Sequence, residues 1–276
     1  MENLVALVQI TSTDDVRENL KKIEGFVQQA RQSGAKMVLL PECCGFMQKH
    51  RTQLRQTAEG FGQGMIQDAL SGMAKEHSIW VLAGSVPIQS NDTEKVINTC
   101  LVYDDLGVIA GRYDKIHLFD VELEGGERYA ESEYTLAGSE LVVIDTPVGK
   151  MGLTICYDLR FPEHYRALVN QGAEILTVPS AFAVPTGKAH WHTLLKSRAI
   201  ENTCYVLAPA QVGEHASGRR TFGHTVAYDP WGKTLAEKSD EGEGLVMVNL
   251  DPDSLSKVRN QLPSLKHQRP ELFNKN

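Results

Sequence analysis

Cys156 lies where an apolar run of the sequence changes into a helical pattern. The run MGLTI before it is typical of a buried strand, and YDLRFPEHYRAL after it soon takes on helical spacing. A turn from a strand into a helix exposes a side chain and surrounds it with backbone N–H groups that lack partners. The positive end of the helix would also favour the thiolate over the thiol. We therefore expect a nucleophile here, although a free cysteine is more commonly a buried structural residue.

Two charged residues also follow segments that read as strands. Glu42 ends MVLLPE, and Lys115 ends VIAGRYDK. Burial would raise the pKa of Glu42 towards that of a working general base. The ammonium of Lys115 would stabilise a developing oxyanion and lower the pKa of a nearby thiol. Taken alone, each of these residues is better explained as a solvated side chain at the end of a strand.

The elements that must position these residues alternate between strands and helices. In the first half we expect strands at 4–10, 37–42, 80–86, 99–104 and 108–115, with helices at 14–33 and near 63–77. In the second half we expect two strands within 140–158, helices at 161–172 and 190–202, and strands at 173–181, 204–211, 225–238 (a hairpin) and 244–251. Two β-rich halves with helices between them predict one α/β domain over residues 1–276, with two sheets and outer helical layers. A polar tail with a short helix is expected from about residue 252.

Composition argues against several classes of partner. The net charge is −7, and the one basic pair, Arg219–Arg220, is too short for a nucleic-acid interface. No apolar stretch approaches the roughly 20 residues of a membrane span, and the N-terminal segment lacks the basic region of a signal peptide. Five cysteines without a CxxC motif predict reduced thiols and a cytoplasmic location.

The remaining cysteines and histidines carry no clear chemistry. We expect structural roles for Cys43, Cys44, Cys100 and Cys204. His190 and His192 are two residues apart on an expected helix, so their rings would point to different faces, and we predict no metal site. A papain-like pairing of Cys156 with a histidine is possible in principle, but no histidine lies in a recognisable partner motif. Asp158 is expected to be a structural partner for arginines or backbone groups.

Several motifs in order resemble one enzyme family over nearly the whole chain. They are PE at 41–42, RYDKIHLFD at 112–120, GLTICYDLRFPE at 152–163, the segment 179–202 and GHTVAYDPWG at 223–232. Their order and spacing are similar to the nitrilase superfamily of carbon–nitrogen hydrolases, and specifically to its Nit branch of amidases. The resemblance implies a four-layer αββα sandwich that dimerises, and an activity that needs no metal or organic cofactor.

The resemblance also implies roles for four residues. Cys156 matches the nucleophile, Glu42 the general base and Lys115 the stabiliser of the oxyanion. Glu131, in RYAESEYTLAG, matches a second glutamate that orients the lysine and the substrate. The implied partner is a small-molecule amide.

Within the Nit branch, the segments KIHLFDVEL, CYDLRFPE and GEHASGRRTFGHT are most similar to those of deaminated-glutathione amidases. Such enzymes cleave the amide between a 2-oxoglutarate unit and cysteinylglycine. The backbone N–H of Tyr157 would bind the oxyanion, and Arg160 would grip a substrate carboxylate.

Other pocket positions follow from the same resemblance. Phe182 and Thr186 match pocket positions of the family. Arg219 and Arg220 would either hold the distal end of a longer substrate or form a solvated loop.

Two alternatives stay open from the sequence. An ω-amidase acting on 2-oxoglutaramate, or a carbamoylase, would keep the fold and change the substrate. A thiol sensor or scaffold with an inactive site would oxidise Cys156 without turnover.

Overall fold

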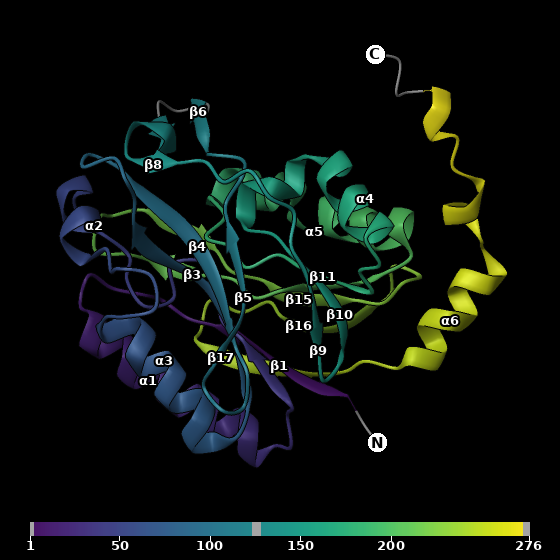
Figure 1. The fold of residues 1–276 in the computed structure, drawn as a ribbon, viewed down its shortest axis with the longest axis horizontal. Helices are drawn as coiled ribbons and strands as arrows, with labels where there is room; N and C mark the ends of the chain where they lie inside the picture. The colour runs from purple at the N-terminus through teal and green to yellow at the C-terminus, as the bar shows by residue number, and fades with distance from the viewer. Residues whose placement is uncertain (1–2, 123–127, 273–276) are drawn as a thin grey trace.

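Two β-sheets stacked face to face form the centre of the molecule (Figure 1). The computed structural model describes residues 3–122 and 128–272. The first sheet has the order β17-β1-β2-β3-β4-β5, with β8 paired to β4. Its strands are β1 (Leu4–Gln9), β2 (Met37–Leu39), β3 (Trp80–Gln89), β4 (Val96–Tyr103), β5 (Ile109–Asp114), β8 (Thr135–Leu136) and β17 (Gly244–Asn249).

The second sheet has the order β16-β15-β12-β11-β10-β9. Its strands are β9 (Val143–Thr146), β10 (Gly149–Leu153), β11 (Ile175–Thr177), β12 (Tyr205–Ala208), β15 (Thr225–Tyr228) and β16 (Thr234–Lys238). Two small hairpins complete the strands: β6 (Asp120–Glu122) with β7 (Arg128–Ala130), and β13 (Val212–Glu214) with β14 (Arg220–Phe222).

Helices cover the outer face of each sheet. α1 (Val16–Gln32) and α3 (Met65–His77) contact the first sheet, whereas α4 (Pro162–Asn170) and α5 (Val184–Asn202) contact the second. The expected four-layer αββα arrangement is therefore confirmed. α2 (Arg51–Thr57) lies beside β3, and α6 (Pro252–Gln261) begins the C-terminal segment on the outside of the molecule (Figure 1).

The apolar runs of the sequence explain why both faces of the first sheet are buried. Along β1, Val5 and Leu7 belong to the core between the sheets, whereas Ala6 and Val8 belong to the core beneath α1 and α3. Side chains of a strand alternate between its faces, so a strand buried on both sides must be apolar throughout. The continuous apolar character of LVALV follows from this position.

Two predicted boundaries are wrong for local reasons. β2 ends at Leu39 rather than at Glu42, because Pro41 has no N–H to donate to a neighbouring strand. α5 begins at Val184 rather than near His190. Pro185 lies in its first turn, where the missing N–H costs nothing.

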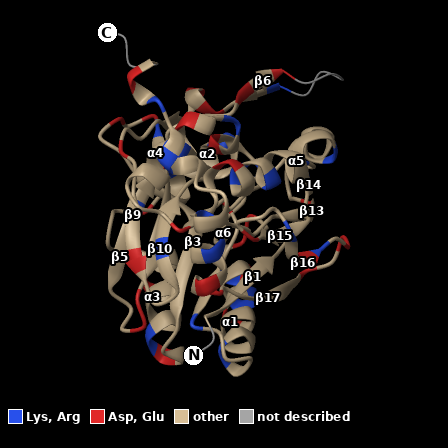
Figure 2. Cartoon of the chain, turned by 90° about the vertical axis from the view of Figure 1, so that its right-hand side faces the viewer, with Lys and Arg blue, Asp and Glu red and all other residues tan. Residues whose placement is uncertain are grey.

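The surface charges and the lengths of the helices follow the composition of the chain. Figure 2 shows acidic and basic residues interspersed over the described chain rather than separated into two faces. Within residues 3–122 and 128–272, no helix is long and apolar enough to cross a membrane.

At Gly84, strand β3 comes very close to the backbone segment that precedes Glu42. A Cβ atom on Gly84 would collide with the backbone carbonyls of Leu40 and Pro41. We expect Gly84→Ala to lower the free energy of unfolding by about 1 to 3 kcal/mol, because the backbone must move to relieve the overlap. The displaced segment would also lower catalytic activity. Thermal unfolding and steady-state kinetics measure both effects.

Gly72 provides the control for this substitution. It is exposed within α3, and a Cβ there meets nothing within 4 Å. Gly72→Ala should stabilise the protein by about 0.5 to 1 kcal/mol through its helix propensity. A Gly84→Ala protein with the stability and activity of the parent would show that the close approach is dispensable.

Candidate active site

The three residues predicted to do chemistry converge from the ends of three strands. Glu42 follows β2, Lys115 follows β5 directly, and Cys156 follows β10 at the start of the 3-10 helix η2 (Cys156–Arg160). Their exposed fractions are 4%, 2% and 7%. β2 and β5 belong to the first sheet and β10 to the second, so the site lies where the two sheets meet at their strand ends.

Lys115 lies between two carboxylates. Its Nζ is 2.9 Å from Glu42 Oε1, and 3.1 and 2.9 Å from the two carboxylate oxygens of Glu131. Glu131, in the 3-10 helix η1 (Glu131–Glu133), also accepts a hydrogen bond from the backbone N–H of Phe119 at 2.7 Å. The arrangement holds the lysine in one orientation, because each carboxylate is itself held by the chain.

Asn98 links the two carboxylates and was missed by sequence analysis. Its Nδ2 donates to Glu42 Oε1 at 3.1 Å and lies 3.5 Å from Glu131 Oε1. It lies inside β4, where its neighbours in sequence are apolar residues or threonine and give no sign of chemistry. Glu42 Oε2 in turn accepts a hydrogen bond from the backbone N–H of Ala181 at 2.9 Å. Ala181 lies between β11 and α5, so this bond joins Glu42 to the segment that leaves the second sheet.

The pKa of Glu42 moves opposite to our expectation. Burial alone would raise it, but the charge and hydrogen bond of Lys115, together with the charge of Arg219, lower the pKa of Glu42 overall. Burial likewise opposes the charge on Lys115, yet Glu131 and Glu42 raise the pKa of Lys115 well above its usual range. Glu42 and Lys115 are therefore both ionised at neutral pH.

The pKa of Cys156 is also opposite to the expected thiolate. Burial and the negative charge of Glu42 raise the pKa of the thiol more than Lys115 lowers it. The thiol lies close enough to the Glu42 side chain for each group to shift the pKa of the other, so a proton acceptor is nearby. The backbone at Cys156 has a φ of 48°, in the left-handed region, and its N–H donates to Pro179 O at 3.0 Å.

Asp158 fastens the turn that begins at Cys156 to the segment after Lys115. Its Oδ2 accepts from Tyr113 Oη at 2.7 Å and from the Ile155 N–H at 2.8 Å. Its Oδ1 accepts from the backbone N–H of His117 at 3.1 Å and lies 2.7 Å from the ring Nδ1. The predicted structural role fits this position, although the side-chain partners are tyrosine and histidine rather than arginine.

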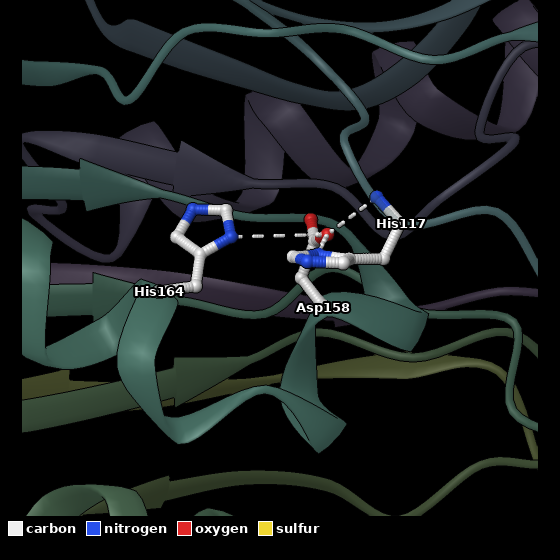
Figure 3. Close-up of side chains that lie close together, drawn as sticks. All are labelled: His117, Asp158 and His164. Atoms are coloured by element: carbon white, nitrogen blue, oxygen red, sulfur yellow. Dashed lines mark hydrogen bonds and ion pairs between the residues drawn. The ribbon is translucent and has the colours of Figure 1, made fainter. Parts of the chain in front are cut away.

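His117 and His164 both lie close to Asp158 (Figure 3). His164 Nδ1 is 3.9 Å from Asp158 Oδ1, and the ring of His117 stacks on Phe161 with centroids 3.6 Å apart. Asp158 already accepts four short hydrogen bonds, so its lone pairs are used in holding the turn. These bonds hold the turn at Cys156 against the segment that follows Lys115.

A cavity of about 810 Å³, counted with the space at its mouth, opens onto Glu42, Lys115 and Cys156. Three predicted substrate-binding residues line it: Tyr157, Phe182 and Thr186. Its lining combines aromatic and apolar side chains with a few charged groups, which is typical of small-molecule sites.

The arginine that lines the cavity is not the one predicted to bind a substrate carboxylate. Arg219 lines the cavity, whereas Arg160 and Arg220 are not among the described residues that line it. Arg160 lies over the rings of Tyr157 and Phe182, at 5.9 and 5.6 Å. Its contact with a substrate carboxylate stays a prediction.

Comparison with known proteins identifies the family of this chain. Residues 4–260 match the family described as carbon-nitrogen hydrolase. The chain belongs to the carbon–nitrogen hydrolase family. This hydrolase is 43% identical over 267 residues to the deaminated glutathione amidase of Yersinia enterocolitica, a match covering 96% of this chain and 92% of that protein.

Solved structures agree with this assignment. Nit3 of Saccharomyces cerevisiae, a member of branch 10 of the nitrilase superfamily, is 32% identical with a TM-score of 0.85, over 95% of this chain and 94% of that one. A mutant of the amidase from Nesterenkonia sp. AN1 is 26% identical with a TM-score of 0.82, over 98% of this chain and 95% of that one. Its active-site cysteine carries the acetamide moiety of fluoroacetamide. The resemblance expected from the motifs is confirmed, and this hydrolase is an amidohydrolase.

The raised pKa of Cys156 predicts an unusual alkylation profile. A free thiol reacts with iodoacetamide at a rate that levels off above its pKa of about 8.5. We expect alkylation of Cys156 to keep rising through about pH 10, because burial and Glu42 keep the thiol protonated. Mass spectrometry of the modified peptide separates Cys156 from the other cysteines. A plateau near neutral pH would show a stable thiolate and contradict the assignment.

Proposed function

We propose that this hydrolase cleaves the amide bond of deaminated glutathione to 2-oxoglutarate and cysteinylglycine, with Cys156 as nucleophile. The observation that carries the proposal is the convergence of Cys156, Glu42 and Lys115 on one cavity. The 43% identity to a deaminated glutathione amidase supports the choice of substrate. ω-Amide or N-carbamoyl substrates are the alternatives on the same site.

In the first step, Sγ of Cys156 attacks the amide carbon while Glu42 accepts the thiol proton. The lowered pKa of Glu42 keeps the carboxylate ionised and ready to accept. The raised pKa of Cys156 keeps the proton on sulfur until attack begins. Proton transfer and attack are therefore coupled, as in general-base activation of a weak nucleophile.

The carbonyl oxygen becomes negatively charged in the tetrahedral intermediate. Lys115 supplies a cation, and the backbone N–H of Tyr157 supplies a second donor. Tyr157 is the second residue of η2, where N–H groups have no acceptor within the helix. Loss of one such donor typically costs about 10²- to 10³-fold in rate.

The intermediate collapses when Glu42 returns the proton to the leaving nitrogen and the C–N bond breaks. Cysteinylglycine departs, and the 2-oxoglutarate unit stays bound to Cys156 as a thioester. Water then loses a proton to Glu42 and attacks the thioester. The C–S bond breaks, and the proton returns to sulfur. Glu131 keeps Lys115 oriented throughout.

Replacement of the nucleophile tests both the site and the substrate. We expect Cys156→Ala to lower release of 2-oxoglutarate from deaminated glutathione by at least about 10³-fold, because no covalent intermediate can form. The release is followed with a coupled 2-oxoglutarate assay, and 2-oxoglutaramate and an N-carbamoyl amine serve as comparison substrates.

The outcomes separate the two parts of the proposal. A wild-type protein that is inactive on deaminated glutathione but turns over a small ω-amide would refute the substrate and leave the site intact. Substantial turnover by Cys156→Ala would refute the site. A folded wild type inactive on every amide, with Cys156 still reactive, would favour the thiol sensor.

We assign the binding of a substrate carboxylate to Arg219. Among the described residues it forms no ion pair, and its Nε is buried without a hydrogen-bond partner. One guanidinium N–H donates to Ala181 O, next to the N–H that holds Glu42. A cation held this way beside the reacting atoms is suited to a carboxylate, which accepts paired hydrogen bonds from arginine.

Arg219→Gln should therefore raise KM for deaminated glutathione by about 10- to 100-fold, the effect of losing a charge-assisted hydrogen bond. The loss on an uncharged amide should be small, and Arg219→Lys should recover part of it. Arg220→Gln, exposed and outside the cavity, is the matched control. An equal loss on charged and uncharged substrates would assign Arg219 a structural role instead.

A homodimer is proposed from the family resemblance. Two exposed apolar residues support it: Trp231 is 60% and Ile200 44% exposed. Gly232, beside Trp231, lies against the Ile200 side chain, so the two form neighbouring apolar surface. Light scattering should report the mass of two chains, and a clean monomer would refute the dimer. The cytoplasmic location and the domain limits stay predictions.

A further inference from the structure

Two histidines and a glutamate that are far apart in sequence meet on the outside of the second sheet. His192 lies on α5, His224 immediately precedes β15, and Glu237 lies on β16. His192 Nε2 is 3.4 Å from His224 Nδ1 and 3.6 Å from Glu237 Oε1, and the third distance, from His224 Nδ1 to Glu237 Oε1, is 3.0 Å. Three potential ligand atoms thus form a nearly equilateral triangle.

This triangle has the dimensions of one face of a tetrahedral metal site. Zinc binds histidine nitrogen and carboxylate oxygen at about 2.0 to 2.2 Å, so ligand atoms in a tetrahedral site lie about 3.3 to 3.5 Å apart. The three measured distances bracket that range. We propose that His192, His224 and Glu237 bind a Zn²⁺ ion or a similar divalent transition metal. The sequence predicted no metal site, because His224 and Glu237 lie far from His192 along the chain.

The ligand rings are held before any ion binds. His192 Nδ1 lies 2.9 Å from Tyr228 Oη, so its other nitrogen has the outer partner that metal-bound histidines usually have. The ring of His224 stacks on Phe222 with centroids 4.2 Å apart. Little side-chain freedom would be lost on binding.

The backbone at His224 is held in an unusual conformation. Its φ is 57°, in the left-handed region that few residues with a side chain adopt. Its carbonyl accepts a hydrogen bond from Nε1 of the fully buried Trp191 at 2.9 Å. Non-glycine residues in this region cluster at functional sites, because their strain must be maintained by the surroundings.

The types of ligand indicate which metal ions the site would bind. Two imidazoles favour zinc, cobalt, nickel or copper over magnesium and calcium, which prefer oxygen ligands. In the single chain, the side chains of His192, His224 and Glu237 are 37%, 26% and 31% exposed, so water can take the fourth position there. The ion would join α5, which begins near Thr186 of the cavity, to the β15–β16 hairpin.

The site is tested with Co²⁺ and Zn²⁺ on the full chain. Cys156→Ala serves as the parent, because a thiol near a carboxylate could bind zinc by itself. We expect one Co²⁺ per chain with the visible absorption of four-coordinate cobalt, displaced by Zn²⁺, and a higher Tm in Zn²⁺. His192→Gln, His224→Asn and Glu237→Gln should each weaken binding at least about tenfold.

His190→Gln is the matched control. It lies two residues before His192 on the same helix, but its Nδ1 faces Arg160 at 3.4 Å. This variant should bind metal as the parent does. Asparagine is chosen at position 224 because it tolerates the left-handed backbone, and equal melting of variant and parent without metal shows that the fold is kept. No binding at millimolar metal, binding unchanged in the three ligand variants, or equal loss in His190→Gln would overturn the proposal.

Discussion

A buried ammonium held between two carboxylates is the interaction on which the rest of the site depends. Lys115 is 2% exposed, and an unpaired cation at such depth costs several kcal/mol. Glu42 and Glu131 provide the charge that makes its burial tolerable. Loss of either partner leaves an uncompensated buried charge, so the three side chains must be placed together. The fold is required to bring three distant segments within about one hydrogen-bond length of one another.

The αββα architecture meets this requirement through the ends of its strands. Glu42 and Lys115 leave the first sheet after β2 and β5, and Cys156 leaves the second sheet after β10. Contacts then cross between the sheets: the N–H of Ala181, beyond β11, donates to Glu42. Asp158 adds a second crossing, since it joins the turn at Cys156 to the segment that follows Lys115. The reacting groups are thus fixed by backbone as well as by one another.

Local sequence patterns were enough to predict most strands of the two sheets and the helices that cover them, because buried strands are apolar and helices show their own period. The short helix α2, the strand β8 and the two small hairpins were not predicted. The order of motifs was enough to predict the family and Cys156, Glu42, Lys115 and Glu131 as site candidates. Contacts between distant segments were not predictable. Asn98 carries no local signal, and the placement of Arg219 rather than Arg160 in the cavity depends on a loop brought in by tertiary structure. The direction of the pKa shifts of Glu42 and Cys156 also depended on which charges became neighbours after folding.

Those two shifts are coherent when the charge of the whole cluster is considered. A resting thiolate would place a third negative charge beside Glu42 and Glu131, with the desolvation cost that burial imposes. Transfer of the proton from Cys156 to Glu42 leaves the total charge of the cluster unchanged. In the proposed mechanism the negative charge only moves, from the carboxylate to sulfur and then to the substrate oxygen. Lys115, held by Glu131, stays in place as the counter-ion for each position of that charge, so the site needs little reorganisation as the bond to carbon forms.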